Sequence, residues 1–483
     1  MVDRVVAYYE AKEERVAALV SPLEVERILK ARTGEGLCVS GAAMSEDAVM
    51  QSLEAVLETS VRTQHPLFLN QLYGESSAVS VGGEAALAVL NTNAHTYEVA
   101  PALTLVERAV VERVGRLVGW ERVDGLTTSG GSMSNLYALH LARHAADPEV
   151  AKRGASGRSA PSCAFVSEDA HYSFLKASRV MGLGDDNLVA VSTDRASGAV
   201  DVDSLEAAIE KSRAEGRVPF FVGTTAGTTV RGGFDDLGAV SEVCARHGLW
   251  HHCDAAWGGP ALLSESLRAA MRGVEACDSV ALNFHKLLNV ALPCALFVTR
   301  HPRSFGVNAT HAPYLFQDEK PFADLDPGDK SIQCGRKADA LKIWLAWRAE
   351  GDRGLARTVD ACVDLARRAA DKVRTHPRLD LVFEPTFANV CFRPSPRQIA
   401  ALDDPDARAR AARRLPPLVK REMHARGCAL IGVTTHRYAG DAPFFRLVVA
   451  HGNSLEFSDL ERTLDLIADI SEEPALLAEA LSQ

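Results

Sequence analysis

Short apolar segments alternate with longer, helix-like stretches through the middle of the chain. The apolar segments are CAFV (163–166), LVAV (188–191), PFFVG (219–223), GLWHHCD (248–254), SVALNF (279–284) and ALFV (295–298). Strands that alternate with helices are typical of a parallel or mixed sheet covered by helices. The sequence therefore predicts an α/β fold with a central mixed, mostly parallel sheet.

The regions on either side of this alternation have a different character. Residues 1–100 look helical and irregular, residues 101–350 hold the predicted large α/β domain, and residues 351–483 combine Ala/Arg-rich helix with the strand-like stretches LDLVFEP, NVCFRP and FFRLVVA. The last helix is expected to begin at a capping box formed by Ser458 and Glu461. We therefore predict three parts: an N-terminal helical segment, a large domain, and a small α+β C-terminal domain.

Composition and charge exclude several classes of protein. The 483 residues carry a net charge of −10 and no basic tract, which argues against binding to nucleic acid or to anionic membranes. No stretch is apolar over the roughly 20 residues that a membrane span needs. Ten cysteines without metal-ligand spacing indicate free thiols in a reducing compartment, so we expect a cytoplasmic protein.

The run His251-His252-Cys253 looks like a metal cluster at first sight. It lies in a predicted strand, where neighbouring side chains point to opposite faces and make a poor shared ligand set. We expect no metal site.

A lysine between two apolar runs raises the question of chemistry. In NFHKLLN (283–289), His285 and Lys286 lie between the runs SVAL and VAL. Lysine is seldom fully buried without a partner or a task. Lys286 is therefore either a surface residue on a turn between strands, or an amine held in a low-dielectric site as a nucleophile or Schiff-base former.

Four further stretches bear on this choice. The loop TTSGGSMSNLYAL (127–139) leads into a helix whose bare backbone N–H groups suit a phosphate, although it could be an ordinary capped turn. Asp254 in CDAAWGG (253–259) follows a predicted strand, where ligands bind in open α/β sheets, although it could be a helix N-cap. His171 in EDAHYSFLKAS (168–178) could stack on a flat ring or be an ordinary satisfied histidine. The small and hydroxyl residues of GTTAGTTVRGGFDDL (223–237) leave room for a ligand or form a flexible loop.

Together these stretches supply a phosphate cradle, a ring-stacking imidazole, an aspartate for a pyridinium nitrogen and a lysine, all at predicted strand ends. That set suits pyridoxal 5′-phosphate.

The sequence also resembles the group II pyridoxal-phosphate-dependent amino acid decarboxylases, in the glutamate, cysteine sulfinate and aspartate decarboxylase branch. The stretches that carry the resemblance run in family order: HPLFLNQLYG (65–74), NTNAHTYEVAP (91–101), SGGSMSN (129–135), HYSFLKA (171–177), TTAGTTVRGGFD (224–235), CDAAWGG, NFHKLL, YLFQDEK (314–320), GDKSIQCGRKADALKIWLAW (328–347), NVCF (389–392) and FFRLVV (444–449).

The resemblance implies the aspartate-aminotransferase-like fold type I, a homodimer with active sites at the subunit interface, and roles for individual residues. Lys286 would carry the cofactor, Asp254 would keep its ring nitrogen protonated, and His171 would stack on the ring. The cofactor-binding set implied is Gly131, Ser132, Met133, His171, Thr225, Asp254, Ala256, Asn283, His285 and Lys286.

The substrate pocket implied by the family comprises Gln71, Tyr73, Asn93, His95 and Arg446. Arg446 matches the arginine that binds the substrate α-carboxylate, for which a planar fork is suited. Tyr73 stands where glutamate decarboxylases have serine, Asn93 matches the glutamate type, and His95 matches neither type. A tyrosine at position 73 shortens the pocket, so we expect cysteine sulfinate, cysteate or aspartate as substrate, giving hypotaurine, taurine or β-alanine. The alternative is glutamate, giving 4-aminobutanoate.

The mobile loop of the family departs most from the pattern. It carries a tyrosine thought to protonate the carbanion, but this chain has DEKPFADLDPGDK, about one residue shorter, with Phe322 near the expected position. Phenylalanine cannot donate a proton. In related enzymes this exchange favours oxidative deamination, so an aldehyde synthase is a second hypothesis, unless another donor such as His171 serves. A third is a catalytically slow, cofactor-binding partner protein, against which the intact site residues argue.

Overall fold

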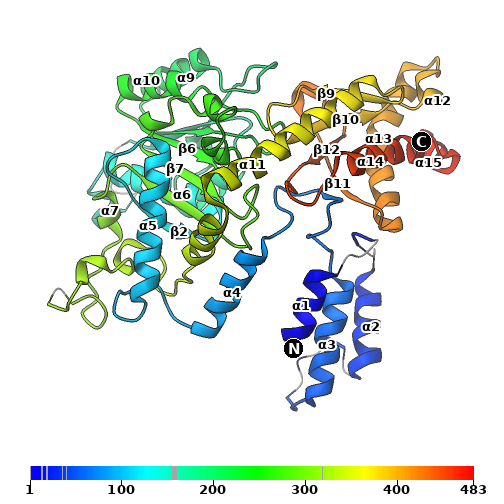
Figure 1. Ribbon diagram of the computed structural model, residues 1–483. Helices are drawn as coiled ribbons and strands as arrows, with labels where there is room; N and C mark the ends of the chain where they lie inside the picture. The colour runs from blue at the N-terminus through cyan, green and yellow to red at the C-terminus, as the bar shows by residue number, and fades with distance from the viewer. Residues whose placement is uncertain are drawn as a thin grey trace. The chain divides into compact units, whose positions relative to one another are not determined.

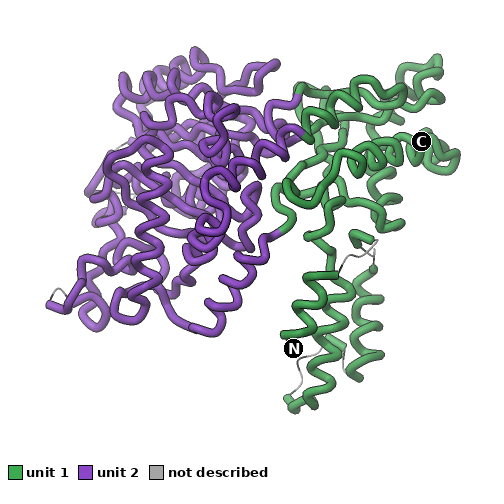
Figure 2. Tube along the Cα trace, viewed as in Figure 1, with its two compact units in different colours: residues 1–75, 365–384, 390–483 green, residues 76–364, 385–389 purple. Residues whose placement is uncertain are grey.

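The computed structural model describes residues 2–11, 15–17, 20–34, 36–37, 39, 41–154, 160–317 and 319–482 (Figure 1). Two compact units divide the chain, as Figure 2 shows by colour: unit 1 comprises residues 1–75, 365–384 and 390–483, and unit 2 comprises residues 76–364 and 385–389. The three-part division at residues 100 and 350 stays a prediction.

Unit 2 is built around a seven-stranded sheet with the order β2-β8-β7-β6-β5-β3-β4. The six predicted strands are all present, and the pairs from β4 through β3, β5 and β6 to β7 are parallel, whereas β8 is antiparallel to both its neighbours. The mixed, mostly parallel sheet is therefore confirmed. The strands are β2 (Asp124–Thr128), β3 (Ser162–Ser167), β4 (Leu188–Val191), β5 (Val218–Thr225), β6 (Trp250–Ala255), β7 (Ser279–Asn283) and β8 (Ala295–Thr299).

Helices cover both faces of this sheet, because its strands are buried on both sides. Adjacent residues of β5 show the two faces: Phe221 packs with Tyr137 of α6, whereas Val222 packs with Ile209 of α9. Burying each such side chain contributes about 1.5–3 kcal/mol. The helices of unit 2 are α4 (Ala78–Leu90), α5 (Pro101–Val118), α6 (Gly131–Ala146), α7 (Val150–Arg153), α8 (Ser173–Val180), α9 (Val202–Ala214) and α10 (Leu237–His247).

Short 3₁₀ helices complete many of the connections. Those in unit 2 are η2 (Asp185–Asn187), η3 (Gly259–Leu263), η4 (Arg268–Met271), η5 (Val274–Ala276), η6 (Ser304–Asn308), η7 (Ala323–Leu325) and η8 (Gly328–Lys330), and unit 1 holds η9 (Arg437–Ala439). The chain leaves unit 2 within the long α11 (Ala340–Thr375), which is interrupted by non-helical backbone at Gly351 (φ 60°, ψ 179°).

Unit 1 contains a five-stranded sheet with the order β1-β11-β12-β10-β9. Its strands are β1 (Phe68–Leu69), β9 (Leu379–Phe383), β10 (Asn389–Pro394), β11 (Leu430–Thr434) and β12 (Phe444–Val448), and its helices are α1 (Val2–Glu10), α2 (Pro22–Thr33), α3 (Glu46–Thr59), α12 (Arg397–Ala400), α13 (Pro405–Arg426), α14 (Phe457–Ser471) and α15 (Pro474–Leu481). Among the described residues, no helix has the length and apolar character needed to cross a membrane.

The predicted start of the last long helix was wrong by two residues. The capping box of α14 is formed by Glu456 and Asp459, each accepting a hydrogen bond from the other's backbone N–H, and not by Ser458 and Glu461. A carboxylate serves as the N-terminal cap as well as a hydroxyl does, because both accept hydrogen bonds from the first turn.

Candidate active site

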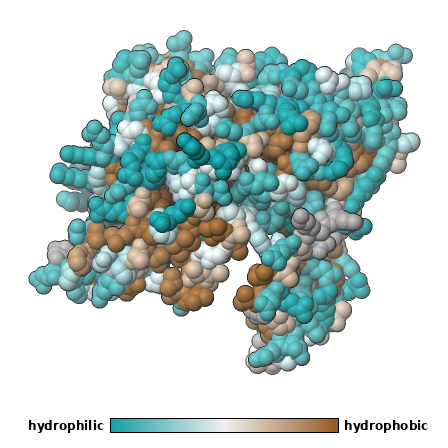
Figure 3. All heavy atoms as spheres, in the orientation of Figure 1, coloured by the Kyte–Doolittle hydropathy of each residue, from teal (hydrophilic) through white to brown (hydrophobic). Residues whose placement is uncertain are grey.

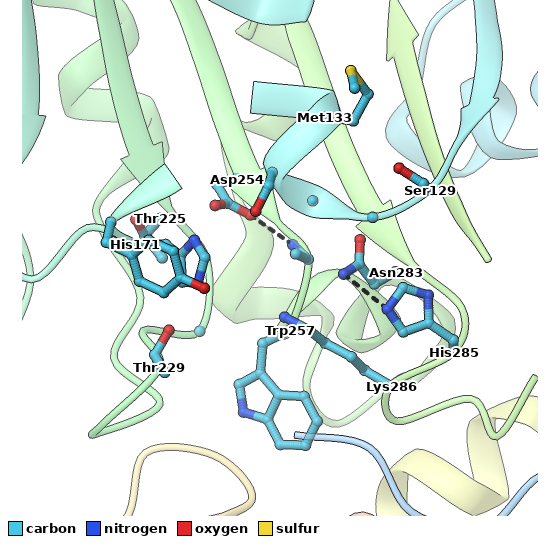
Figure 4. Close-up of a pocket in the computed structure, with 16 residues that line it drawn as sticks. Ser129, Met133, His171, Thr225, Thr229, Asp254, Trp257, Asn283, His285 and Lys286 are labelled. Atoms are coloured by element: carbon cyan, nitrogen blue, oxygen red, sulfur yellow. Dashed lines mark hydrogen bonds between the residues drawn. The ribbon is translucent and has the colours of Figure 1, made fainter. Parts of the chain in front are cut away.

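One pocket of unit 2, with a volume of about 300 Å³, brings together all ten residues of the predicted cofactor-binding set. Figure 4 shows His171, Thr225, Asp254, Asn283 and His285 around this hollow, into which the Lys286 side chain extends. The pocket is lined by Ser129, Gly130, Gly131, Ser132, Met133, His171, Tyr172, Thr225, Gly227, Thr229, Asp254, Ala256, Trp257, Asn283, His285 and Lys286.

The parallel strands explain why these side chains meet. Thr225, Asp254 and Asn283 lie at or next to the carboxyl ends of β5, β6 and β7, and Thr225 and Asp254 are direct neighbours in the sheet register. Carboxyl ends of parallel strands share one edge of a sheet, which is where open α/β sheets bind ligands. The sheet thus places three polar side chains side by side without any of them being close in sequence.

Lys286 lies in a tight turn directly after β7. Lys286 N donates to Asn283 O (3.4 Å), and Asn289, with φ of 54°, donates from its N to Lys286 O (3.2 Å). His285 Nδ1 lies 2.7 Å from the carbonyl oxygen of Cys294, and burial lowers the pKa of His285 to about 4. The turn therefore holds a neutral imidazole and an amine at the edge of the pocket.

The start of α6 forms the end of the pocket that suits a phosphate. No side chain caps this helix at Gly130. A Cβ atom on Gly131 would lie 3.1 Å from the Ala256 Cβ and 3.5 Å from the Asn283 amide, so a side chain at position 131 would press on Ala256. Bare backbone N–H groups at a helix N-terminus bind an anion well.

Asp254 also lines the pocket and is 5% exposed. Its Oδ2 accepts a hydrogen bond from Asn135 Nδ2 (2.7 Å), and its Oδ1 accepts one from Ala256 N (3.1 Å). The carboxylate is thus held in a fixed orientation.

His171 is fixed by its neighbour Ser173. Its Nδ1 lies 2.8 Å from Ser173 Oγ, and its ring centroid lies 4.1 Å from that of Tyr172. Burial lowers the pKa of His171, with Asp254 acting in the opposite direction. The imidazole is therefore neutral at physiological pH.

Two buried oxygens in the pocket complete a set of groups that fits pyridoxal phosphate. Thr225 Oγ1 and Asn283 Oδ1 have no hydrogen-bond partner within the part of the chain that the structure describes. Buried polar atoms without partners are costly unless a ligand or water satisfies them. An unobstructed helix start, a carboxylate, a neutral imidazole and a lysine amine suit a phosphorylated, protonated pyridine ring.

The five predicted substrate residues do not line this pocket. Asn93 and His95 belong to unit 2, and Asn93 Oδ1 accepts a hydrogen bond from Arg336 N (2.8 Å). Tyr73 and Arg446 belong to unit 1: Tyr73 packs on Phe68 with ring centroids 5.7 Å apart, and Arg446 Nη2 donates to Asn70 O (2.7 Å). Gln71, also in unit 1, is exposed. The roles of all five stay predictions.

Several lining residues were not predicted individually from the sequence. Trp257 was within reach, because it follows Asp254 in the quoted stretch CDAAWGG; its Nε1 donates to Asn389 Oδ1 (2.8 Å). Tyr172 lies next to His171 and is 61% exposed. Ser129, Gly130, Gly227 and Thr229 line the pocket through loops whose shape the sequence does not reveal.

Phe322 lies at the start of η7 with a left-handed backbone (φ 63°), which is uncommon for a bulky residue. Its side chain is 60% exposed, and its ring centroid lies 5.2 Å from that of Tyr97. Tyr97 N in turn donates to Asp326 Oδ1 (2.7 Å), which holds this loop against the segment that contains His95.

Comparison with known proteins agrees with this geometry. The profile described as "Pyridoxal-dependent decarboxylase conserved domain" matches residues 34–395. Human cysteine sulfinic acid decarboxylase is 38% identical over 471 residues, covering 96% of this chain and 93% of the relative, and the bovine acidic amino acid decarboxylase GADL1 is 36% identical, covering 90% and 82%. The crystal structure of mouse CSAD superposes with a TM-score of 0.92 at 36% identity, covering 98% of this chain and 96% of that one.

Proposed function

Because the chain belongs to the pyridoxal-dependent decarboxylase family and is a pyridoxal-phosphate-dependent amino acid decarboxylase, we propose that it removes the α-carboxyl group of a short acidic amino acid. The substrates proposed are cysteine sulfinate, cysteate and aspartate. The proposal is carried by one observation: Lys286, Asp254 and His171 line the same pocket, in a chain that matches 93% of the length of a cysteine sulfinic acid decarboxylase.

The residues of the pocket divide the work of holding the cofactor. Lys286 would bind it covalently, the N–H groups of Gly131 and Ser132 would bind its phosphate, and Asp254 would accept a hydrogen bond from its protonated ring nitrogen. When bound, pyridoxal phosphate supplies an electron sink for the electron pair left when CO₂ departs. His171 would cover one face of the ring.

Substrate selection is proposed to depend on unit 1. Arg446 is half-buried, and burial lowers the pKa of its guanidinium. Burial also lowers the pKa of Lys420, and the charge of Arg446 acts in the same direction. Two half-buried cations that repel each other suit an anion, which supports a substrate with two acidic groups. Tyr73 would set the chain length, since one methylene is worth roughly 1–3 kcal/mol in such a pocket.

A second candidate reaction is favoured by Phe322. A decarboxylase must return a proton to the carbon that lost CO₂, and phenylalanine at position 322 has none to give. If no other group supplies it, molecular oxygen accepts two electrons from that carbon and becomes peroxide, and water then releases ammonia and leaves the aldehyde.

We also propose that the enzyme is a homodimer, in which a second copy covers the apolar surface of α4. Figure 3 shows brown, apolar residues gathered over α4 and the neighbouring part of unit 2. On α4, Val89 is 86% exposed, Leu90 56% and Val79 39%, and Val99 and Leu105 are also exposed. Contiguous exposed apolar surface of this kind marks protein–protein interfaces.

The nine cysteines that the structure describes are free thiols, which supports a cytoplasmic location.

The homodimer is tested by Val89→Lys, which places a charge in the proposed interface. Sedimentation is expected to show wild-type dimers and variant monomers. The matched control is Val180→Lys, which changes another valine in the last turn of a helix, 74% exposed on α8. Wild-type monomers, or dimers of both variants, would contradict the proposed interface.

The reaction is tested by product analysis. The holoenzyme is given cysteine sulfinate, cysteate, aspartate and glutamate separately, while amine, CO₂, peroxide and aldehyde are followed. Amine equal to CO₂ from a short acid supports the proposal. Faster turnover of glutamate contradicts the proposed substrates, and peroxide in step with CO₂ indicates the aldehyde reaction.

The cofactor site is tested separately by Lys286→Ala. This variant is expected to lose the cofactor on desalting and to lose activity, whereas Lys211→Ala, which changes an exposed lysine on α9, keeps both. A Schiff base that borohydride still traps on the protein in Lys286→Ala would exclude Lys286 as the attachment point.

A further inference from the structure

Asn135 is fully buried in the second turn of α6 and connects the two groups that flank the proposed cofactor ring. Its amide Nδ2 lies 2.7 Å from Asp254 Oδ2 and 2.9 Å from Ser173 Oγ, and Ser173 Oγ lies 2.8 Å from His171 Nδ1. Neither Asn135 nor Ser173 lines the pocket. A chain of hydrogen bonds thus joins Asp254 to His171 behind the pocket wall.

The hydrogen-bond network continues from Asn135 through His252 and Ser279 to Trp250, and the direction of each hydrogen bond can be assigned from the Trp250 end. Trp250 Nε1 can only donate, and its partner at 2.9 Å is Ser279 Oγ. Ser279 therefore has its own hydrogen available for His252 Nδ1, also 2.9 Å away. Burial lowers the pKa of His252 to about 4, so this ring is neutral and carries its single proton on Nε2.

The next link fixes the amide of Asn135. His252 Nε2 lies 3.0 Å from Asn135 Oδ1 and donates to it. This orientation leaves the NH₂ group of Asn135 facing Asp254 and Ser173. A carboxylate can only accept, so the contact with Asp254 requires the same orientation independently. The assignment from Trp250 and the assignment from Asp254 therefore give the same orientation of the Asn135 amide.

The last link assigns the proton of His171. Ser173 Oγ accepts from Asn135 and therefore donates its own hydrogen to His171 Nδ1, which also accepts from Ser173 N (3.3 Å). A neutral imidazole with Nδ1 as acceptor carries its proton on Nε2.

We infer that Asn135 is a positioning residue that fixes two things at once: the orientation of the Asp254 carboxylate and the proton of His171 on Nε2, the nitrogen left for a ligand in the pocket. This inference rests on the proposed cofactor site. It gives His171 a proton on the ring nitrogen that the network does not occupy, in a chain whose loop has phenylalanine where the proton donor is expected.

The test is direct observation of the His171 tautomer. ¹⁵N-histidine-labelled protein, with and without pyridoxal phosphate, is examined by long-range ¹H–¹⁵N correlation, and the His171 signal is assigned from its absence in His171→Asn. The expected result is a proton on Nε2 in both forms. A proton on Nδ1 in the wild type overturns the inference. The reading on the apo form is independent of the cofactor, so failure of the proposed cofactor site, seen with Lys286→Ala, is recognised separately.

Two variants test the role of the network. Asn135→Asp has the same shape but replaces the donor with an acceptor, so Ser173 is expected to turn its hydrogen toward residue 135 and the His171 proton to move to Nδ1. Ser173→Ala removes the hydroxyl that joins Asn135 to His171 but leaves the contact between Asn135 and Asp254, and it is expected to give a mixture of both tautomers. By analogy with outer-shell partners of metal ligands, kcat should fall by about 10–100-fold, with KM changed little.

Ser134→Ala is the matched control, because like Ser173→Ala it removes a buried hydroxyl, and this one lies next to Asn135 on α6 and pairs with Thr128 Oγ1 (2.8 Å) outside the network. It should keep the wild-type tautomer and kcat. If Asn135→Asp does not fold, Ser173→Ala decides the matter. If the folded variants keep the proton on Nε2 and a kcat equal to that of Ser134→Ala, Asn135 is only a structural residue and the inference fails.

Discussion

The ion pair between Glu107 and Arg336 gives the sharpest test of how the fold is stabilised next to the site. Both side chains are buried, with 8% and 3% exposed. Arg336 Nη2 contacts Glu107 Oε1, and Nη1 donates to Ala94 O (2.7 Å). Arg336 also joins the segment 93–95 through its backbone, since its N donates to Asn93 Oδ1 and its O accepts from Ala94 N. The pair therefore ties the segment that carries Asn93 and His95 to α5.

Arg336→Met would remove the charge and keep most of the volume. The Glu107 carboxylate would then keep only the two hydrogen bonds from Thr127, and Ala94 O would lose its partner. Breaking a buried pair by removing one partner costs about 3–5 kcal/mol. Since a whole domain is stable by about 5–15 kcal/mol, we expect a large fall in the midpoint of urea denaturation.

The effect should depend on pH in a defined direction. Burial alone would raise the pKa of Glu107, but the charge and hydrogen bonds of Arg336 outweigh it and hold the pKa below the ordinary value of 4.5. A lowered pKa in the folded state adds stability that is present above 4.5 and is lost as the pH falls through the folded value. In Arg336→Met burial is not opposed, so the carboxyl takes up a proton readily. The gap between wild type and variant should therefore shrink from pH 7 toward pH 4.

The assay is urea denaturation of the apo protein at both pH values and at one protein concentration. Adding Glu107→Gln to Arg336→Met should recover part of the loss, because the uncompensated buried charge is gone. Arg179→Met, which breaks an exposed pair with Asp185, should have a much smaller effect. A variant as stable as the wild type at pH 7, or a gap that does not shrink in acid, would refute the reasoning.

Three further changes test the site itself. Gly131→Ala should weaken cofactor binding about tenfold, or about 1.4 kcal/mol, because the new Cβ meets Ala256; Gly306→Ala, with open space around it, should not change the fluorescence titration. Tyr73→Ser should raise the ratio of kcat/KM for glutamate over cysteine sulfinate by about 10–200-fold, and an unchanged ratio would remove Tyr73 from the substrate pocket. Phe322→Tyr should lower any peroxide formed per CO₂; a peroxide yield unaffected by this change would show that position 322 does not protonate the product.

The strands of the large sheet could be predicted because their side chains are apolar on both faces. Continuous runs such as CAFV and SVALNF are what a strand buried on both sides requires, and they became β3 and β7. The edge strand β2 escaped prediction because DGLTT holds a single large apolar residue, Leu126. It becomes a strand through its partner, since Leu126 pairs with Phe297 of β8 in a register that the sequence alone does not contain.

The pocket followed from the same logic, but the network behind it did not. Lys286, Asp254 and His171 each lie at or soon after the end of a predicted strand. Their place in the fold and the chemistry of their side chains therefore both indicated a ligand site. Asn135 and Ser173 are 38 residues apart, and Asn135 and His252 are 117 apart; an asparagine in a helix and a serine at a helix start are unremarkable by themselves.

This network bears on the meaning of Phe322. A missing loop tyrosine predicts aldehyde only if no other acid reaches the carbon that loses CO₂. With the inferred proton on Nε2, His171 is a second candidate for that acid, and the buried partners that would keep the proton there do not depend on the loop. The aldehyde reaction would therefore require more than the loss of the tyrosine. If Ser173→Ala raises the peroxide formed per CO₂ whereas Ser134→Ala does not, protonation in this enzyme depends on the buried network rather than on the loop.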